Sequence, residues 1–466
     1  MTLLPAMKLL LTIPLLLASF SIRHSSFAAA PPNVILIVAD DLGWADLGCC
    51  GSKFHQSPNL DKLAAQGMRF TEAYAAAPVC SPTRAALMTG KSPARLGMTR
   101  HLAPRAQPSG KLVEPPQPAA LAPGETTVAE VLKRQGYATG IVGKWHLGHG
   151  AAGPGARGFD FVFCGDDWGL PGSYFSPYGI PKMPDGPKDE YLTDRLTAEA
   201  GRFLEENKTR PFLLVLTHFA PHVPLQAPAD LVAKYRAKPK HGGQSNPTYA
   251  AMIEKLDDSV GGILDKLDAL KLTQNTMVIF TSDNGGFTHD AITSNAPLRG
   301  GKAEVYEGGL RVPLLVRWPG KVRAGATCDV PVVSMDLPRT ILALSGAQPG
   351  AGEFCDGEDL SPVLADSTRA LHRSELFFHY PHYHQYGTKP AGAMRAGDWK
   401  LIEHYEDDAL ELFNLRDDLG ETKNIATENP AKVKELHERF TAWLKDTKAQ
   451  MPSPNPNYEK PAKDSK

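Results

Sequence analysis

The chain has little cysteine, no excess of charge of either sign and, beyond its first thirty residues, no long apolar run. Only 6 of the 466 residues are cysteines, and they show no zinc-type spacing, which excludes a scaffold held by disulfides. The 50 Lys and Arg residues balance 51 Asp and Glu residues. This balance excludes the basic surface that nucleic acids or anionic membranes require, so an anionic partner must meet locally placed cations.

The one marked apolar run lies at the N-terminus. Lys8 precedes an apolar stretch at 9–20, and small residues follow up to Ala30, the pattern of a secretory signal peptide cleaved near Ala30. The run is short for a membrane span, and an uncleaved anchor is the alternative. The sequence therefore predicts an exported protein, periplasmic or secreted, with residues 1–30 as its signal peptide. Export permits disulfides, and Cys328 with Cys355 is one candidate pair.

Short apolar runs alternate with helical patterns along most of the chain. The runs are apolar on both faces, as in buried parallel strands, and lie at 33–39, 212–216, 277–280 and 312–316. Helical patterns lie between them at 58–67, 126–135, 194–206 and 249–270. The alternation predicts an α/β fold over residues 31–345, with a doubly wound, mostly parallel sheet flanked by helices. Pro313 places the last run at a sheet edge or at a strand start.

The pattern changes after residue 346. Segments at 375–380, 399–404 and 410–414 predict a short antiparallel sheet, and 432–445 predicts a closing helix. We therefore expect a small α+β subdomain over residues 346–450. The tail, residues 451–466, is rich in Pro, Asn and Lys and is expected to be disordered.

Polar side chains follow two of the predicted strands. Asp40 and Asp41 follow the run at 33–39, and Asp283 and Asn284 lie just beyond the run at 277–280. In open α/β sheets ligands bind outside the carboxyl ends of the strands, and carboxylate and amide oxygens favour calcium or magnesium. Helix caps or Asx turns are the alternative. Both pairs together favour a metal site.

Lysine and histidine occur in two further glycine-rich segments, one of them where a predicted strand passes into a loop. Lys144 and His146 follow a strand at 140–143, and Lys302 lies in a glycine-rich stretch at 299–311. Glycine lets the backbone approach a ligand closely, while Lys and His clamp a tetrahedral oxyanion and move protons near neutral pH. Taken singly, each is more simply a surface lysine or a hydrogen-bonded histidine.

Residues 80–84, Cys-Ser-Pro-Thr-Arg, are predicted to begin a helix. Ser81 suits the N-cap, Pro82 suits the first helical position, and Gly90 suits the left-handed residue that closes a helix. Cys80 would then lie just before a helix N-terminus, where free N–H groups and the helix dipole favour anions. We expect a reactive thiol or an anion-handling group there.

The set of motifs resembles the type I, formylglycine-dependent sulfatases, the arylsulfatase-like group of the alkaline phosphatase superfamily. The stretches 80–90 and 136–146 resemble the two signatures of that family. Further similar stretches follow in family order at 40–43, 57–61, 220–224, 282–285, 298–313 and 411–424. The resemblance covers residues 32–445 and implies an alkaline-phosphatase-like sheet.

The resemblance implies a chemistry centred on Cys80. In the family this cysteine is oxidised to Cα-formylglycine by a formylglycine-generating enzyme, and a hydroxyl of the aldehyde hydrate attacks sulfur. By motif position, the metal would be calcium, with magnesium as the alternative. Its ligands would be Asp40, Asp41, the modified Cys80, Asp283 and Asn284.

The remaining catalytic roles also follow from motif position. Arg84 would orient the hydrate, and Lys144 and Lys302 would bind sulfate oxygens. His146 would act as the base that releases sulfate, and His222 would protonate the leaving oxygen. His218, near a predicted strand end, is expected to be structural.

The substrate is expected to be a carbohydrate. Arg100, His101 and Arg105 lie on a loop beyond the predicted helix, and the C-terminal subdomain supplies His379, His382, His384 and Arg395. Such side chains suit sugar hydroxyls and neighbouring anionic groups, although a histidine-rich surface strand is the alternative. A sulfated galactose or N-acetylgalactosamine is the leading candidate.

Two other functions remain open from the sequence. A phosphonate or phosphate monoester hydrolase can share the scaffold and the formylglycine signature. A non-catalytic protein that binds sulfated glycans would differ by lacking turnover.

Overall fold

The structure is a computed structural model that describes Thr2 and residues 31–102, 110–165 and 169–458. Apart from Thr2, the expected signal peptide lies outside the described residues, as does Arg105. Across the described part of the chain, every helix is too short or too polar to span a bilayer.

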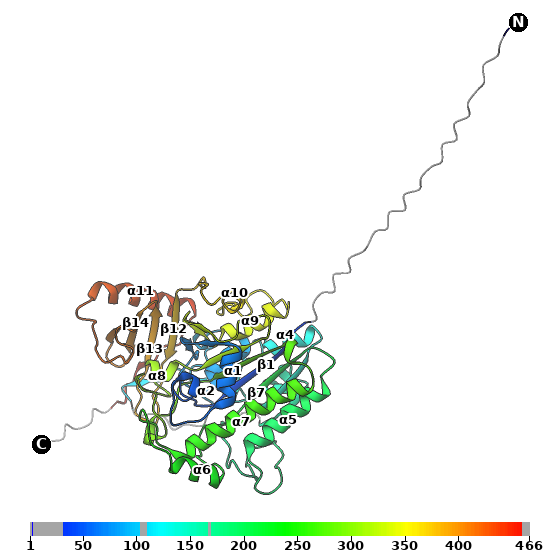
Figure 1. Cartoon of the computed structure of the whole chain (residues 1–466). Helices are drawn as coiled ribbons and strands as arrows, with labels where there is room; N and C mark the ends of the chain where they lie inside the picture. The colour runs from blue at the N-terminus through cyan, green and yellow to red at the C-terminus, as the bar shows by residue number, and fades with distance from the viewer. Residues whose placement is uncertain (1, 3–30, 103–109, 166–168, 459–466) are drawn as a thin grey trace. The chain divides into compact units, whose positions relative to one another are not determined.

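An eight-stranded sheet lies at the centre, in the order β10-β2-β9-β8-β1-β7-β5-β6 (Figure 1). Five neighbouring strands are parallel: β8 (Thr276–Ser282), β1 (Asn33–Ala39), β7 (Phe212–Thr217), β5 (Ala138–Lys144) and β6 (Phe161–Gly165). Only β9 (Leu314–Arg317) is reversed against its neighbours β8 and β2 (Met68–Phe70), and β10 (Ala326–Cys328) runs parallel to β2. The expected mostly parallel sheet is confirmed, and β9 makes it a mixed sheet.

Pro313 lies directly before β9, and this strand is inside the sheet rather than at its edge. The proline, which has no N–H, therefore lies before the first residue of β9 whose N–H is needed for hydrogen bonds between strands. Of the two positions that the sequence allowed for this proline, the structure shows the strand start.

β1 is buried on both faces because almost all of its side chains are apolar. Val34, Leu36 and Val38 belong to one core, and Ile35 and Ile37 to the other. The first core includes side chains of α2 (Cys80–Thr89), α4 (Val128–Arg134) and α9 (Asp336–Leu344). The second includes side chains of α1 (Pro58–Gln66), α5 (Leu192–Glu206) and α7 (Pro247–Ala269), and α5 and α7 lie side by side in Figure 1.

Short elements connect these layers. The helical ones are η1 (Gly48–Cys50), α3 (Pro93–Leu96), η2 (Gly150–Ala152), η3 (Pro154–Arg157), α6 (Ala229–Arg236), η4 (Thr273–Asn275), η5 (His289–Ala291), α8 (Glu307–Leu310) and α10 (Ser361–Ala365). The strands β3 (Ala73–Tyr74) and β11 (Val332–Val333) pair in parallel beside the main sheet.

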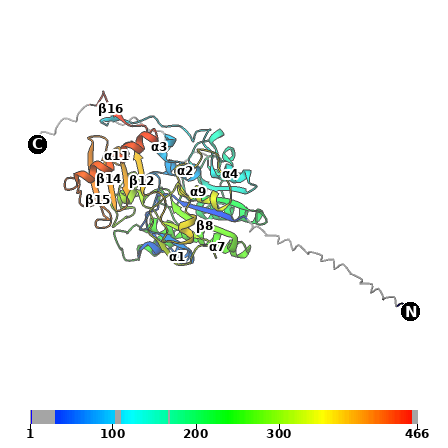
Figure 2. The ribbon, with the colours of Figure 1, turned by 90° about the horizontal axis from the view of Figure 1, so that it is seen from above.

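The C-terminal part carries a separate antiparallel sheet. Its strands pair in chain order: β12 (Glu375–Tyr380), β13 (Ala391–Ala396), β14 (Trp399–His404) and β15 (Ala409–Asn414). Helix α11 (Pro430–Asp446) packs on one face through Leu436 and Phe440 (Figure 2). The other face packs toward α2 and α8. The short antiparallel sheet is confirmed, and β13 is an added strand.

A buried network of charged side chains joins this sheet to the rest of the chain. Lys400 Nζ on β14 lies 2.9 Å from Glu307 Oε1 of α8 and 2.8 Å from Glu421 Oε1. Arg311 Nε lies 2.9 Å from Glu307 Oε2, and Arg395 on β13 pairs with Glu72. The Gly285 N–H donates to the Gly309 carbonyl at 3.0 Å, so α8 is also tied to the loop that follows β8.

Two expectations about the ends of the chain and its cysteines need correction. The tail was expected to be disordered from residue 451, but β16 (Ser453–Pro454) pairs with β4 (Leu112–Val113), and the Asn455 N–H donates to the Lys111 carbonyl at 2.9 Å. These bonds use backbone groups of a distant segment, which composition does not reveal. Cys328 is buried and Cys355 is exposed, and both are free, so the candidate disulfide is absent.

Candidate active site

Four neighbouring parallel strands end at one edge of the sheet, and polar residues follow each of them. They are Asp40 and Asp41 after β1, Asp283 and Asn284 after β8, His222 after β7, and Lys144 and His146 at the end of β5. Because strands of one direction share one carboxyl edge, residues far apart in sequence meet there. The structure thus brings together the residues that were predicted at strand ends.

Three carboxylates and one amide form the buried base of the site. Asp40, Asp41 and Asp283 are 0%, 2% and 0% exposed, and the Asp41 N–H donates to Asp283 Oδ1 at 3.3 Å. Asn284 Nδ2 donates to Asp41 Oδ1 at 2.8 Å, while the buried Asn284 Oδ1 has no hydrogen-bond partner among the described residues. Clustered carboxylates with an unpaired amide oxygen are the donor set that a hard divalent cation prefers.

Three cationic side chains reach the same carboxylates. Lys144 Nζ lies 2.6 Å from Asp40 Oδ2, and Lys302 Nζ lies 2.8 Å from Asp41 Oδ2. Arg84 Nε and Nη2 both lie 2.8 Å from Asp283 Oδ2. Burial by itself raises the pKa of Asp40, but the neighbouring cations, with Lys144 foremost, hold this pKa well below its usual value.

Cys80 is the first residue of α2, not the residue before the helix. Val79 is extended and acts as the N-cap, which makes Ser81 and Pro82 the second and third helical residues and corrects their expected positions. Pro82 is still tolerated because the first four N–H groups of a helix have no partner within it. Gly90 closes α2 in the left-handed region (φ 62°), as predicted.

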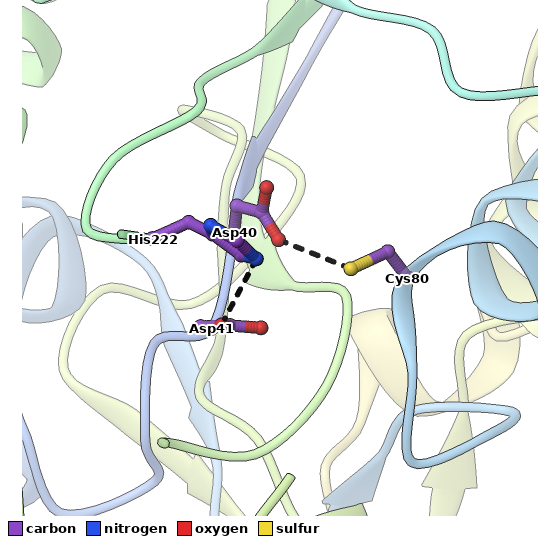
Figure 3. Close-up of side chains that lie close together, drawn as sticks. All are labelled: Asp40, Asp41, Cys80 and His222. Atoms are coloured by element: carbon purple, nitrogen blue, oxygen red, sulfur yellow. Dashed lines mark hydrogen bonds and ion pairs between the residues drawn. The ribbon is translucent and has the colours of Figure 1, made fainter. Parts of the chain in front are cut away.

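The Cys80 thiol faces Asp40 at the base of the site. Its Sγ lies 3.4 Å from Asp40 Oδ1, and Figure 3 shows it approaching from α2 opposite Asp40, Asp41 and His222. Burial and the charge of Asp40 raise the pKa of this thiol above its usual value. The thiol stays protonated, which makes the unmodified side chain a poor nucleophile.

Two histidines border the carboxylates. His222 Nε2 lies 3.5 Å from Asp41 Oδ2, and His222 Nδ1 lies 2.8 Å from the Val223 carbonyl. His146 Nε2 lies 2.7 Å from the Leu102 carbonyl, and its buried Nδ1 has no hydrogen-bond partner among the described residues. Burial lowers the pKa of both imidazoles, and Lys144 lowers that of His146 further.

Asp41 and His146 also adopt the left-handed backbone region, with φ of 63° and 59°. Such conformations are costly for residues other than glycine and persist where the surrounding structure enforces them. Here the chain turns sharply at the strand ends and directs both side chains toward one place.

A pocket of about 680 Å³ opens above these groups. Its lining includes Cys80, Asp41, Lys144, His146, His222 and Lys302. Arg100, His101 and His384, which were predicted to contact substrate, also line it. Four further lining residues were not predicted, because they lie on loops whose course depends on the fold: Gln117, Leu170, Phe287 and Tyr386.

Other expected residues lie outside the pocket lining. His382 is fully buried, with Nδ1 3.0 Å from Glu114 Oε2 and Nε2 2.7 Å from Thr99 Oγ1. Arg395 belongs to the buried network, where it contacts Glu72 and Tyr74. Both side chains bind protein groups behind the pocket, so the prediction that they contact substrate is corrected.

His379, His218 and Arg84 are likewise enclosed by protein. His379 lies between the Tyr405 hydroxyl and the Gln450 carbonyl, 2.8 and 3.0 Å away. His218 Nε2 lies 3.1 Å from Ser259 Oγ. Arg84 donates to the Lys144 carbonyl at 2.9 Å as well as to Asp283, and it does not line the pocket.

Carboxylates, lysines and neutral histidines gathered at the carboxyl edge of the central sheet are the groups that a hydrolase of anionic esters uses. The sulfatase family model matches residues 32–347, and the model "N-sulphoglucosamine sulphohydrolase, C-terminal" matches residues 301–450. The chain belongs to the sulfatase family of the alkaline phosphatase superfamily and is a sulfuric ester hydrolase.

Individual relatives agree with this assignment. Human steryl-sulfatase is 33% identical and shares 79% of this chain and 75% of its own length. Human N-acetylgalactosamine-6-sulfatase is 36% identical over 73% of this chain and 67% of its own. The crystal structure of Ps i-CgsB in complex with k-i-k-neocarrahexaose is 31% identical, with a TM-score of 0.79 over 90% of this chain and 93% of that one.

Proposed function

We propose that this protein is an exported sulfatase that removes sulfate from a carbohydrate, with a sulfated galactose or N-acetylgalactosamine as substrate. The observation that carries the proposal is the place of Cys80, at the start of α2 and 3.4 Å from the buried Asp40 carboxylate. Lys144, Lys302 and His222 line the same pocket. The proposed nucleophile, the two lysines that would bind the anion and the histidine that would donate a proton therefore line one pocket.

The nucleophile is proposed to be formylglycine, made from Cys80 by a formylglycine-generating enzyme. The unmodified thiol stays protonated, and a single oxygen in its place would end as a stable sulfate ester. The hydrated aldehyde would supply two hydroxyls: one would lose its proton and form the bond to sulfur as the bond between sulfur and the alcohol oxygen breaks. Loss of the proton of the second would reform the carbonyl and break the bond between carbon and the sulfate oxygen, which releases sulfate.

The donor set fits calcium, with magnesium as the alternative. Asp40, Asp41, Asp283 and Asn284 would hold the ion, and the unpartnered Asn284 Oδ1 supports this assignment. Bound there, the ion supplies positive charge beside the nucleophile and the sulfate. Lys144 and Lys302 bind sulfate oxygens from the pocket wall and offset the charge that develops during transfer.

Proton movement is assigned to the two histidines. The unpartnered Nδ1 of neutral His146 suits a base, which takes the proton from the second hydroxyl. His222 gives a proton to the leaving oxygen. An incoming sulfate ester adds negative charge near His222 and favours its protonated form, beside the Asp41 carboxylate 3.5 Å away.

Mass spectrometry of the peptide across Cys80 tests the nucleophile. In protein from the native host we expect the formylglycine mass, which is lower than that of cysteine because an aldehyde oxygen replaces the thiol. Unmodified Cys80 in active protein would contradict the mechanism. Protein from a host without the modifying enzyme serves as the unmodified control and is expected to lack turnover.

A second assay compares reaction classes. Aryl sulfate, phosphate monoester and phosphonate ester are offered to the modified enzyme side by side, with the highest kcat/KM expected on the sulfate. Higher efficiency on a phosphorus ester would favour the phosphonate hydrolase alternative. Sulfated-glycan binding without turnover by the modified protein would favour the non-catalytic alternative.

A further inference from the structure

Five aromatic rings from three distant segments form a continuous row beside the pocket, called here the ring row. They are His101, His384, Tyr386, Phe287 and His289. The centroid distances along it are 5.6 Å from His101 to His384, 5.0 Å from His384 to Tyr386, and 4.7 and 4.6 Å from Tyr386 to Phe287 and His289. All except His289 line the pocket that contains Cys80.

Tyr386 is the exposed member of the row. Tyr386 is 36% exposed, while its neighbour Phe287 is 6% exposed and His289 stacks on Tyr386 with ring planes 26° apart. Leu170, which lines the same pocket, is 43% exposed. Apolar area left in water is unfavourable, and a ligand that covers these side chains recovers that free energy.

The neighbouring groups are polar. The Arg100 N–H donates to Gln117 Oε1 at 3.1 Å, and Gln117 Nε2 donates to the Arg100 carbonyl at 3.2 Å, which fixes both at the pocket wall. Gln385 lines the pocket beside Tyr386. A pyranose ring needs this combination, since it has an apolar C–H face and hydroxyls around its edge. A sterol would require apolar contact throughout.

We infer that Tyr386 determines specificity by stacking on the apolar face of the sugar that carries the sulfate ester. The inference rests on the proposed function and narrows its substrate class to a pyranose with one open C–H face. The residue comes from the loop between β12 and β13, so the C-terminal subdomain contributes directly to substrate selection. Phe287, from the loop after β8, and His289, the first residue of η5, contact its ring.

The test uses two variants of the modified enzyme, with N-acetylgalactosamine 6-sulfate as substrate. Tyr386→Ala is expected to raise KM about tenfold, which corresponds to 1.4 kcal/mol, with kcat changed less than twofold, because stacking on the sugar binds the ground state and the transition state equally. Tyr386→Phe keeps the ring and is expected to match the parent enzyme. The inhibition constant of inorganic sulfate, which contacts only the pocket base, is expected to stay unchanged in both.

Val162→Ala is the matched control, because Val162 is 43% exposed and does not line the pocket. An unchanged KM in Tyr386→Ala would overturn the inference, as would an equal rise in the sulfate inhibition constant, which would indicate general damage. Faster turnover of a sterol sulfate than of the sugar sulfate would overturn the choice of a pyranose.

Failure of the proposed function can be told apart from failure of this inference, because sugar binding can be measured without turnover. If the parent enzyme hydrolyses no sulfate ester, saturation-transfer NMR with the same sugar sulfate still tests whether the sugar stacks on Tyr386. We then expect transfer to the protons of the C–H face in the parent protein and its loss in Tyr386→Ala. Equal transfer in both proteins would overturn the inference.

Discussion

At the scale of single residues, the site depends on buried charges that neutralise one another. Lys144 Nζ lies 2.6 Å from Asp40 Oδ2, and Lys302 Nζ lies 2.8 Å from Asp41 Oδ2. Both pairs are buried away from bulk water. Removing one partner of a buried pair leaves the other uncompensated, which costs about 3–5 kcal/mol. Substitutions at these four positions therefore affect folding as well as catalysis, and the histidines are better places to separate the two.

His222→Ala tests the assignment of the leaving-group acid. We expect kcat/KM to fall about 100- to 10,000-fold for a sugar sulfate, whose alkoxide needs a proton. For 4-nitrophenyl sulfate the fall should be much smaller, because the phenolate leaves without one. The two rates are measured on the modified enzyme with His241→Gln, at an exposed position, as the control. Equal losses on both substrates would contradict the assignment.

The sequence predicted individual site residues well where they follow strands. Asp40, Asp283 and Lys144 could be placed because parallel strands bring their ends together. Arg395 and His382 could not, since residue type does not tell whether a side chain points to a pocket or to a buried partner. Tyr386 was missed because an aromatic residue in a loop gives no signal until its neighbours are known.

At the scale of elements, the end of β5 shows how closely the strands approach one another near the site. Gly143 has a φ of 107°, and a Cβ there would lie 1.8 Å from the Thr217 carbonyl oxygen of β7. Only glycine fits at this point, directly before Lys144. The close approach of β5 to β7 therefore fixes where the lysine leaves the sheet.

Gly143→Ala is expected to separate the two strands and to lower the free energy of unfolding by more than the roughly 1–3 kcal/mol of a strained backbone conformation. Urea unfolding measures the change. Gly346→Ala is the matched control, since Gly346 also has positive φ (69°) but open space around it, and it should show the backbone cost alone. Equal losses in the two variants would contradict the steric argument.

Prediction of the elements succeeded where the sequence had a continuous apolar run or a clear amphipathic period. β1 and β7 are apolar on both faces, and α7 has a long amphipathic pattern. β13 was missed because its sequence, Ala-Gly-Ala-Met-Arg-Ala, has few residues that favour strands. It is a strand because β12 and β14 pair with it on both sides.

At the scale of the whole molecule, buried neutral histidines make the fold sensitive to acid. Burial lowers the pKa of His218 to about 3 and that of His379 to about 4. Below the unfolded pKa of about 6.5, the unfolded chain binds protons that the folded chain does not. Stability is therefore full above this pH and falls by about 1.4 kcal/mol per pH unit for each histidine as the pH decreases toward the folded value.

His379→Gln is expected to reduce this loss. Between pH 7 and pH 5, the free energy of unfolding of the variant should fall by about 2 kcal/mol less than that of the parent protein. Urea unfolding at both pH values measures the difference, and comparing changes with pH removes the cost of the substitution itself. Parallel pH profiles would contradict the prediction.

The buried network between α8 and the C-terminal sheet has a consequence for exchanging parts between sulfatases. Lys400, Glu421 and Arg395 come from one side of that junction, and Glu307, Arg311 and Glu72 from the other. A chimera that borrows another relative's C-terminal subdomain to acquire its substrate-selecting loop inherits only half of these charges. We expect such a chimera to fold only when all six side chains are transferred together or replaced by a matching set of charges. Charge pairing at this junction, more than loop length, then limits which C-terminal parts can be exchanged between sulfatases.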